Sequence, residues 1–398
     1  MIHYPKVLLL LMLSLAACNK TNEAVSVQAP SEASVAPKEI SKAITLHDVG
    51  GWHNTMWRAG LYPKTISRVA KVVHANTVTV VDTHFVTSVD ETGYRIAYKP
   101  RKHDWTPTDG QWRKIGNYAD NNALQLQMLV MLHSEFGVDL WQTRADADKQ
   151  NDTKFWDSYF KQYSSLVSQR AKIAEKAGVD SIVLGYDGSI DLAQDTKYWK
   201  AIIESIRAAG FTGEIGLWTG LDAQNNWSGI KIAENKSSSY RVRNNLSYFD
   251  FVLLQTQDIT KNALQRSLRS LKRYNVPLQV MVITPSVTTG VTEDEYIEPA
   301  TGINNRGNSL APSRELSFEV QNGAYQAVID IINDPSFDYV IGINSWGYHF
   351  RDDLFYGYEP GDADYQKSAN VRRKPAEQLL AKWYKEWDLV AWDTKIYD

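Results

Sequence analysis

The sequence is poor in cysteine, because Cys18 is its only cysteine among 398 residues. A single cysteine excludes an intrachain disulfide and a metal cluster ligated by cysteines. The chain also lacks a strong excess of one charge, since its formal net charge is −3 and its pI is about 6.3. This balance disfavours nucleic acid as the main partner.

Long apolar runs are scarce as well, and the clearest one lies near the start, at residues 7–15. It is about half as long as the roughly 20 residues that a membrane-spanning helix requires. Lys6 precedes it, and the small residues Ala16 and Ala17 lead from it to Cys18. This order predicts a signal peptide over residues 1–17.

Residues 14–18, Ser-Leu-Ala-Ala-Cys, resemble the lipobox of bacterial lipoproteins. The resemblance implies that Cys18 carries a thioether-linked diacylglycerol, so that a lipid anchors the chain to a membrane. The residue after Cys18 is Asn19 and not aspartate. This resembles the default pattern of Gram-negative lipoproteins, which are sent to the outer membrane. We therefore expect a protein of the cell envelope; an ordinary secretory signal with an incidental cysteine is the alternative.

Residues 18–43 are predicted to be the lipidated cysteine and a flexible tether. The segment from Asn19 to Ser41 contains no aromatic residue and consists largely of Ser, Ala, Pro, Glu and Val. Such a segment buries too little apolar surface to offset the entropy of ordering it. From residue 44 to 398 aromatic and apolar clusters recur without another linker, which predicts one large domain.

Short β-rich runs alternate with amphipathic helices along this domain, a pattern typical of parallel strands joined by helical crossovers. The predicted strands are 44–50, 77–83, 125–132, 181–186, 214–218, 249–255, 278–283 and 339–344. The clearest helices are 153–177, 195–209, 261–273, 315–333 and 375–387. Eight such units predict a (β/α)8 TIM barrel with enlarged βα loops. A doubly wound open sheet is the alternative, but no glycine-rich phosphate-binding motif follows the first strand, so no nucleotide cofactor is expected.

Barrel enzymes carry their reacting groups at the C-terminal ends of the strands. Those ends combine aromatic rings, amides, imidazoles and carboxylates, which is the mixture that a carbohydrate cleft uses to bind sugar faces and hydroxyl groups. Four histidines are scattered among them without metal-ligand spacing, so no metal is expected. The residues predicted to bind substrate are Trp52, His53, Asp82, His84, His133, Glu135, Tyr186, Trp218, Gln255, Gln257, Asn344 and Trp346.

Several segments resemble glycoside hydrolase family 113. They are residues 105–109 with the run 127–133, residues 155–180, residues 184–187 with 198–199, and residues 374–377 with 381–384. The resemblance implies a (β/α)8 barrel with the activity of retaining β-mannanases, acting on a polysaccharide or oligosaccharide. It is more specific for a barrel glycosidase than for a mannanase.

Two positions depart from the family pattern. Asp187 stands where the family has its acid/base glutamate, after the fourth strand, and its side chain is one methylene shorter. It remains our candidate general acid. The family's nucleophile is a glutamate near the end of strand 7, but residues 280–286 read Val-Met-Val-Ile-Thr-Pro-Ser and contain no carboxylate.

Three explanations of the missing carboxylate remain open. In the first, the mechanism is inverting and a second rim carboxylate activates water at about 6.5–9.5 Å from the acid. Asp258 is the first candidate for this base, and Asp82 and Glu135 follow. In the second, the loop after strand 7 supplies a carboxylate from residues 293–298. In the third, hydrolysis is lost and the protein is a non-catalytic glycan-binding lipoprotein.

The same residues also have structural interpretations. Asp187 and Asp258 could cap helices or close turns, His84 and His133 could be hydrogen-bonded structural imidazoles, and Trp218 and Trp346 could be packing residues. The predicted partners are a saccharide substrate and the membrane that holds the lipid. We expect a monomer.

Overall fold

The computed structural model describes residues 40–46, 57–58, 60–89, 96–99, 106–134, 153–185, 196–220, 246–256, 261–284, 286, 316–348 and 369–393. Side chains are not described for residues 85–89, 96–99, 133–134, 387–393 and a few single positions. Internal contacts divide the chain into Met1–Pro37 and Lys38–Asp398, and all the described residues belong to the second unit.

Eight parallel strands form a closed barrel, as the sequence predicts. Going around it, β1 pairs with β9 on one side and with β2 on the other, and this second pairing closes the sheet. The barrel strands are β1 (Ser41–Leu46), β2 (Thr77–Val89), β4 (Gln125–Ser134), β5 (Ser181–Leu184), β6 (Glu214–Gly220), β7 (Phe251–Thr256), β8 (Leu278–Val282) and β9 (Val340–Tyr348).

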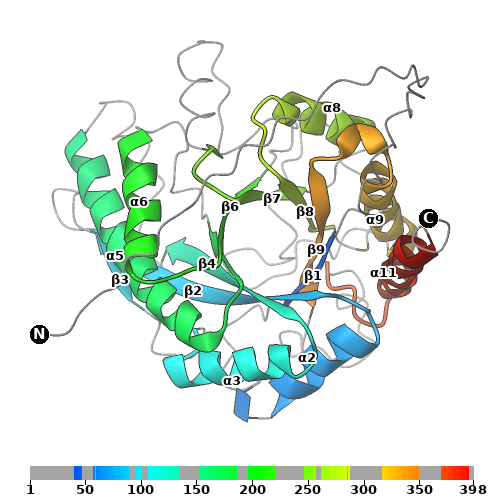
Figure 1. Ribbon diagram of the computed structural model, residues 1–398, viewed down its shortest axis with the longest axis horizontal. Helices are drawn as coiled ribbons and strands as arrows, with labels where there is room; N and C mark the ends of the chain where they lie inside the picture. The colour runs from blue at the N-terminus through cyan, green and yellow to red at the C-terminus, as the bar shows by residue number, and fades with distance from the viewer. Residues whose placement is uncertain are drawn as a thin grey trace, which may run out of the picture. The chain divides into compact units, whose positions relative to one another are not determined.

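Helices surround the strands on the outside, as Figure 1 shows. They are α2 (Leu61–Lys71), α3 (Asp109–Asp120), α5 (Thr153–Ala177), α6 (Thr196–Ala208), α8 (Lys261–Lys272), α9 (Phe318–Ile332), the short 3-10 helix η1 (Pro335–Phe337) and α11 (Pro375–Asp393). The α3 helix begins with a capping box, in which the Thr108 hydroxyl accepts from the Gln111 N–H and the Gln111 side chain accepts from the Thr108 N–H. None of the helices in the described parts of the chain is both long and apolar enough to cross a membrane.

Several strand ends differ from the prediction. β1 begins at Ser41, inside the predicted tether, because Ile40 and Ala43 are buried and the strand pairs with β9 from Ser41 onward. β2 continues six residues past its predicted end and pairs antiparallel with the unpredicted strand β3 (Ile96–Lys99). β9 continues to Tyr348, four residues past the predicted Asn344. These extensions change which residues lie inside a strand and which lie at its end.

Side chains alternate between two apolar layers along each strand. One layer fills the barrel and includes Val81, Leu129, Val183, Leu253 and Met281. The other packs between the strands and the helices, and each strand alternates between the two: in β2, Val78 and Val80 face the helices. A residue that packs in the first layer therefore faces the barrel interior, and a residue that packs in the second faces the surrounding helices.

Toward the N-terminal ends of β2, β4 and β5, the barrel interior contains a buried polar layer. The Asn344 amide donates to the Thr79 hydroxyl at 3.0 Å, and its oxygen accepts from the Thr45 hydroxyl at 2.5 Å. The Thr79 hydroxyl donates to Gln127, whose amide donates to Ser181. These side chains come from five neighbouring strands, so the layer ties the β9–β1–β2 junction to β4 and β5.

Candidate active site

Two tryptophans meet at the C-terminal ends of the barrel strands. Trp218 of β6 and Trp346 of β9 stack with ring centroids 5.7 Å apart and an interplanar angle of 26°. Trp346 is 4% exposed and belongs to the interior apolar cluster, whereas Trp218 is partly exposed and packs against that cluster. The sequence predicted both as substrate-binding residues, and the structure brings them together inside the barrel mouth. A partly exposed indole held by a second ring can stack against a sugar face.

Gln255 lies near these rings on β7. In the sheet it is paired with Gly220 of β6 and Met281 of β8, and it follows the inward-facing Leu253 by two residues. Its side chain is half-buried. This placement leaves an amide at the wall of the mouth, where its donor and acceptor could bind sugar hydroxyls.

Asn344 lies deeper than the sequence suggested. It is fully buried in the polar layer, where Thr45, Thr79 and Gln127 occupy its amide group. The predicted strand ended at this residue, but β9 runs four residues further, so Asn344 lies within the barrel and Trp346 is closer to the mouth. These hydrogen bonds favour a structural role for Asn344 over the predicted contact with substrate.

Asp82 is a heavily bonded carboxylate on β2. Its side chain is fully buried and accepts from Arg170 Nε at 2.7 Å and Arg170 Nη2 at 2.8 Å. The Trp112 indole N–H donates to it at 3.2 Å, and His84 Nε2 lies 3.0 Å away. Asp82 is two positions after Val80, which faces the helices, and its partners Arg170 and Trp112 come from α5 and α3. The carboxylate is therefore held between the barrel and the helices.

The charge of Asp82 is stabilised strongly. Burial alone raises the pKa of this carboxyl, but the Arg170 guanidinium and His84 outweigh burial and lower the pKa to about 2. A carboxylate with so low a pKa and a bidentate guanidinium partner is a poor general base. The network favours structural roles for Asp82 and His84, and it favours Asp258 and Glu135 over Asp82 as the second catalytic carboxylate.

The end of β8 agrees with the sequence in offering no carboxylate. Ile283 is in the interior apolar cluster, and the Thr284 carbonyl accepts from Gln321 of α9 at 2.9 Å. Behind it, the buried Lys374 ammonium donates to the Ser286 hydroxyl at 3.2 Å, and burial lowers the pKa of Lys374 well below its usual value. β8 is the seventh strand of the barrel. The glutamate that the family carries near the end of this strand therefore has no counterpart among the described residues here.

The other predicted site residues lie outside the described residues. They are Trp52, His53, Glu135, Tyr186, Asp187, Gln257, Asp258 and Cys18, the predicted lipidation site, together with the loop residues 293–298; for His133 only the backbone, within β4, is described. Among the described residues, no group of three His, Cys, Asp or Glu side chains could hold a metal ion.

Sequence reasoning missed Arg170, which holds Asp82. It lies on the buried stripe of α5 that also contains Tyr163, Val167 and Ala174. A cation on an apolar stripe is a readable signal, because a buried charge requires a partner.

The comparisons with known proteins agree with this architecture. The sequence model of Glycoside Hydrolase Family 113 matches residues 51–244, which span β2 to β6. No curated protein matches the sequence.

Solved structures share the fold over most of the chain. A GH113 β-1,4-mannanase, solved in a complex, is 15% identical with a TM-score of 0.59 and covers 87% of this chain and 99% of its own. The GH113 β-mannanase AaManA from Alicyclobacillus acidocaldarius, in complex with ManMIm, is 16% identical with a TM-score of 0.62 and covers 88% and 98%. The exo-β-1,4-mannosidase Op5Man5 from Opitutaceae bacterium strain TAV5 is 9% identical with a TM-score of 0.55 and covers 89% and 60%.

Proposed function

We propose that this protein is a glycoside hydrolase that cleaves a polysaccharide or oligosaccharide, with Asp187 as general acid. The observation that carries the proposal is the match of residues 51–244 to Glycoside Hydrolase Family 113 within a closed (β/α)8 barrel. The mouth of that barrel presents the Trp218–Trp346 pair and Gln255. β-1,4-Mannans are the first substrates to test, because two of the similar structures are β-1,4-mannanases.

Asp258 and Glu135 are the first candidates for the second carboxylate, and a carboxylate from residues 293–298 is the alternative. Asp258, two residues past the end of β7, is the first choice for a base that activates water in an inverting reaction. Glu135 is the other candidate, and in the sequence it directly follows Ser134, the last residue of β4. An inverting pair stands about 6.5–9.5 Å apart, whereas a retaining pair stands about 5–5.5 Å apart.

The decisive experiment incubates the purified protein with β-mannan, β-glucan, β-galactan and bacterial exopolysaccharides, and follows the products and their anomeric form by NMR. We expect hydrolysis of at least one glycan with inversion. Asp187→Asn should lower kcat by about 10²–10⁴-fold, the contribution of a positioned general acid. Asp120→Asn, which alters an exposed carboxylate at the end of α3, should leave kcat unchanged.

The same assay separates the alternatives. Loss of activity in Asp258→Asn but not in Glu135→Gln would identify Asp258 as the base, and the opposite result would identify Glu135. Retention of configuration would contradict the inverting mechanism. Glycan binding without any hydrolysis would favour the non-catalytic glycan-binding function over the enzyme.

The proposal also places this activity at the cell envelope. The support comes from the sequence alone: the lipobox-like residues 14–18 and the tether that follows them. A short lipid-anchored tether would keep the barrel within a few nanometres of the membrane surface. An enzyme so placed would meet envelope or extracellular glycans.

A further inference from the structure

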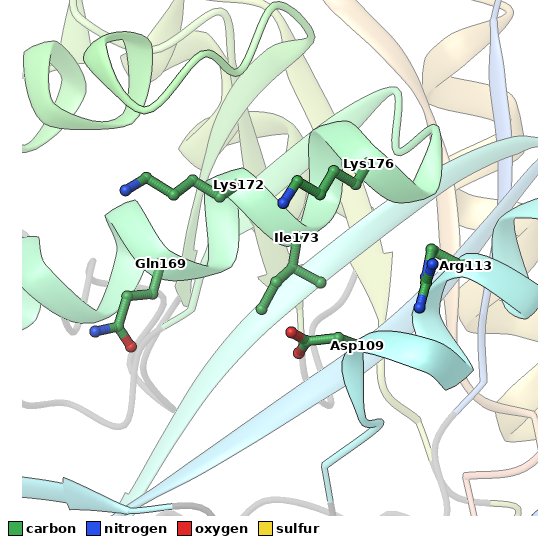
Figure 2. A pocket seen from close by; sticks show the side chains of 6 residues that line it. All are labelled: Asp109, Arg113, Gln169, Lys172, Ile173 and Lys176. Carbon is green, nitrogen blue, oxygen red and sulfur yellow. The ribbon is translucent and has the colours of Figure 1, made fainter.

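A groove of about 470 Å³ lies between α3 and α5 on the outside of the barrel. Figure 2 shows it from close by: Ile173 of α5 points toward Asp109 of α3, whereas the side chains of Lys172 and Lys176 extend along α5. Its lining has exposed cations around one partly buried isoleucine. The lining residues are Asp109 and Arg113 of α3 and Gln169, Lys172, Ile173 and Lys176 of α5.

The groove is a local positive site in a chain whose formal net charge is −3. Its three cations, Arg113, Lys172 and Lys176, and its one carboxylate, Asp109, together give +2. No carboxylate among the described residues forms an ion pair with any of these three cations. Lys172 and Lys176 stand four residues apart on one helix, an arrangement in which like charges repel. A bound anion would relieve this repulsion.

The shape of the groove is set by close packing next to it. Gly116 lets α3 approach the C-terminal end of α5, because a Cβ atom at this position would lie 1.8 Å from the Ala177 carbonyl oxygen. Behind the groove, Arg170 bonds to Asp82 and comes within 4.0 Å of Asp109. Both helices are therefore held in place without a ligand, so their backbones do not have to move to form the groove.

We propose that this groove binds an acidic saccharide unit of a glycan. The cations would bind the saccharide's carboxylate, while Gln169 and Asp109 would hydrogen-bond to its hydroxyl groups. The Ile173 side chain would contact the apolar face of the ring. Asp109 favours a ligand that carries hydroxyl groups beside its charge over a bare anion such as phosphate, because the Asp109 carboxylate can accept hydrogen bonds from hydroxyl groups.

This inference rests on the proposed function, since a glycan-cleaving enzyme would use a second site to hold its polymeric substrate. The groove lies on the outer surface of the helices, whereas the candidate catalytic site lies at the barrel mouth. Binding at the groove can therefore be measured separately from hydrolysis.

The test compares two ligands that differ only in charge: a β-1,4-mannuronate tetrasaccharide and the neutral β-1,4-mannotetraose. Binding to the purified full chain is measured by isothermal titration calorimetry at low and at moderate salt. The groove variant combines Arg113→Gln, Lys172→Gln and Lys176→Gln. The matched control combines Lys64→Gln, Arg266→Gln and Lys385→Gln, which removes three exposed cations from α2, α8 and α11.

We expect the acidic tetrasaccharide to bind the wild type and the control equally, and the groove variant about tenfold or more weakly, as the loss of charge-assisted hydrogen bonds predicts. Salt should weaken this binding, because the groove cations are exposed to solvent. Hydrolysis of a neutral substrate should not change in the groove variant.

Equal affinity of the groove variant and the control would overturn the proposal. If the neutral tetrasaccharide bound the groove with the same affinity as the acidic one, the proposal would also be overturned. The same holds if the groove bound a tri-glutamate peptide or phosphatidylglycerol vesicles in place of the acidic sugar. A wild type that hydrolyses no glycan but binds the acidic sugar through the groove would refute the enzyme and leave the groove site standing. Hydrolysis without groove-dependent binding would refute the groove site and leave the enzyme standing.

Discussion

Replacing Arg170 by methionine should destabilise the fold by several kcal/mol. The substitution keeps most of the apolar stem but removes the guanidinium that binds the fully buried Asp82 at 2.7 and 2.8 Å. With Arg170 and His84 present, the pKa of Asp82 is lowered from 3.8 to about 2. That difference corresponds to about 2 kcal/mol of net stabilisation, because one pKa unit is ~1.36 kcal/mol. Burial already opposes this value, so an unpaired Asp82 should cost more, about 3–5 kcal/mol.

The pH dependence follows from the direction of this change. A carboxyl whose pKa is lowered on folding contributes stability that is complete above its unfolded pKa of 3.8 and is lost as the pH falls toward 2. The wild type should lose ~1 kcal/mol through this group by pH 3. In Arg170→Met, burial should raise the pKa of Asp82 instead. Protonation in acid would then remove the cost of burying an unpaired carboxylate. The stability difference between the two proteins should therefore narrow between pH 6 and pH 3.

The assay is guanidinium chloride unfolding followed by tryptophan fluorescence, with the slopes compared to exclude a change in the denatured state. Lys161→Met, which removes an exposed cation from the same helix, is the control and should change stability by no more than about 0.5 kcal/mol. The double variant Arg170→Met/Asp82→Asn should be more stable than Arg170→Met alone at neutral pH. A loss below about 1 kcal/mol in Arg170→Met, or a difference that stays constant with pH, would refute the assignment of Asp82 as a buried, ionised partner.

Two further predictions concern the helix packing and the membrane. Gly116→Ala should destabilise the fold by about 1–3 kcal/mol, because the added Cβ would lie 1.8 Å from the Ala177 carbonyl oxygen and α3 would have to move; Gly110→Ala, which meets nothing within 4 Å, is the control in the same unfolding assay. Cys18→Ser should release the protein from the membrane fraction without changing its glycan binding, and a variant that still sediments with membranes would rule out the lipid anchor.

The barrel could be predicted because its strands are buried on both faces and so appear in the sequence as short apolar runs. All eight predicted strands overlap with observed ones, and the eight parallel strands close as expected. β3 could not be predicted in this way. Its four residues pair only with the part of β2 that extends beyond the predicted strand, so its formation depends on a partner that the local pattern does not reveal.

The candidate site was harder to predict because the role of a residue depends on where its strand ends and on the face to which it points. The predicted strand 2 ended at Thr83, which placed Asp82 and His84 at the rim. β2 in fact continues to Val89, and both residues are buried within the strand. The same error at β9 made Asn344 a rim residue. Trp218 and Trp346 each lie within two residues of the end of their strand, so their predicted role in binding substrate stays a prediction.

Two ion pairs with buried carboxylates stabilise the barrel wall on either side of β1. On β2, Asp82 bonds to Arg170 of α5; near β9, Glu377 of α11 bonds to Arg68 of α2 at 2.8 Å and accepts from the Tyr348 hydroxyl. Each pair fixes a strand next to β1 to the helices outside it. Tyr348 lies two residues beyond Trp346, so the second pair also fixes the strand end that carries this ring. Both carboxylates are bound by arginines, so the proposed catalytic carboxylates would come from the loops beyond the strand ends, where Asp187, Asp258 and Glu135 lie in the sequence.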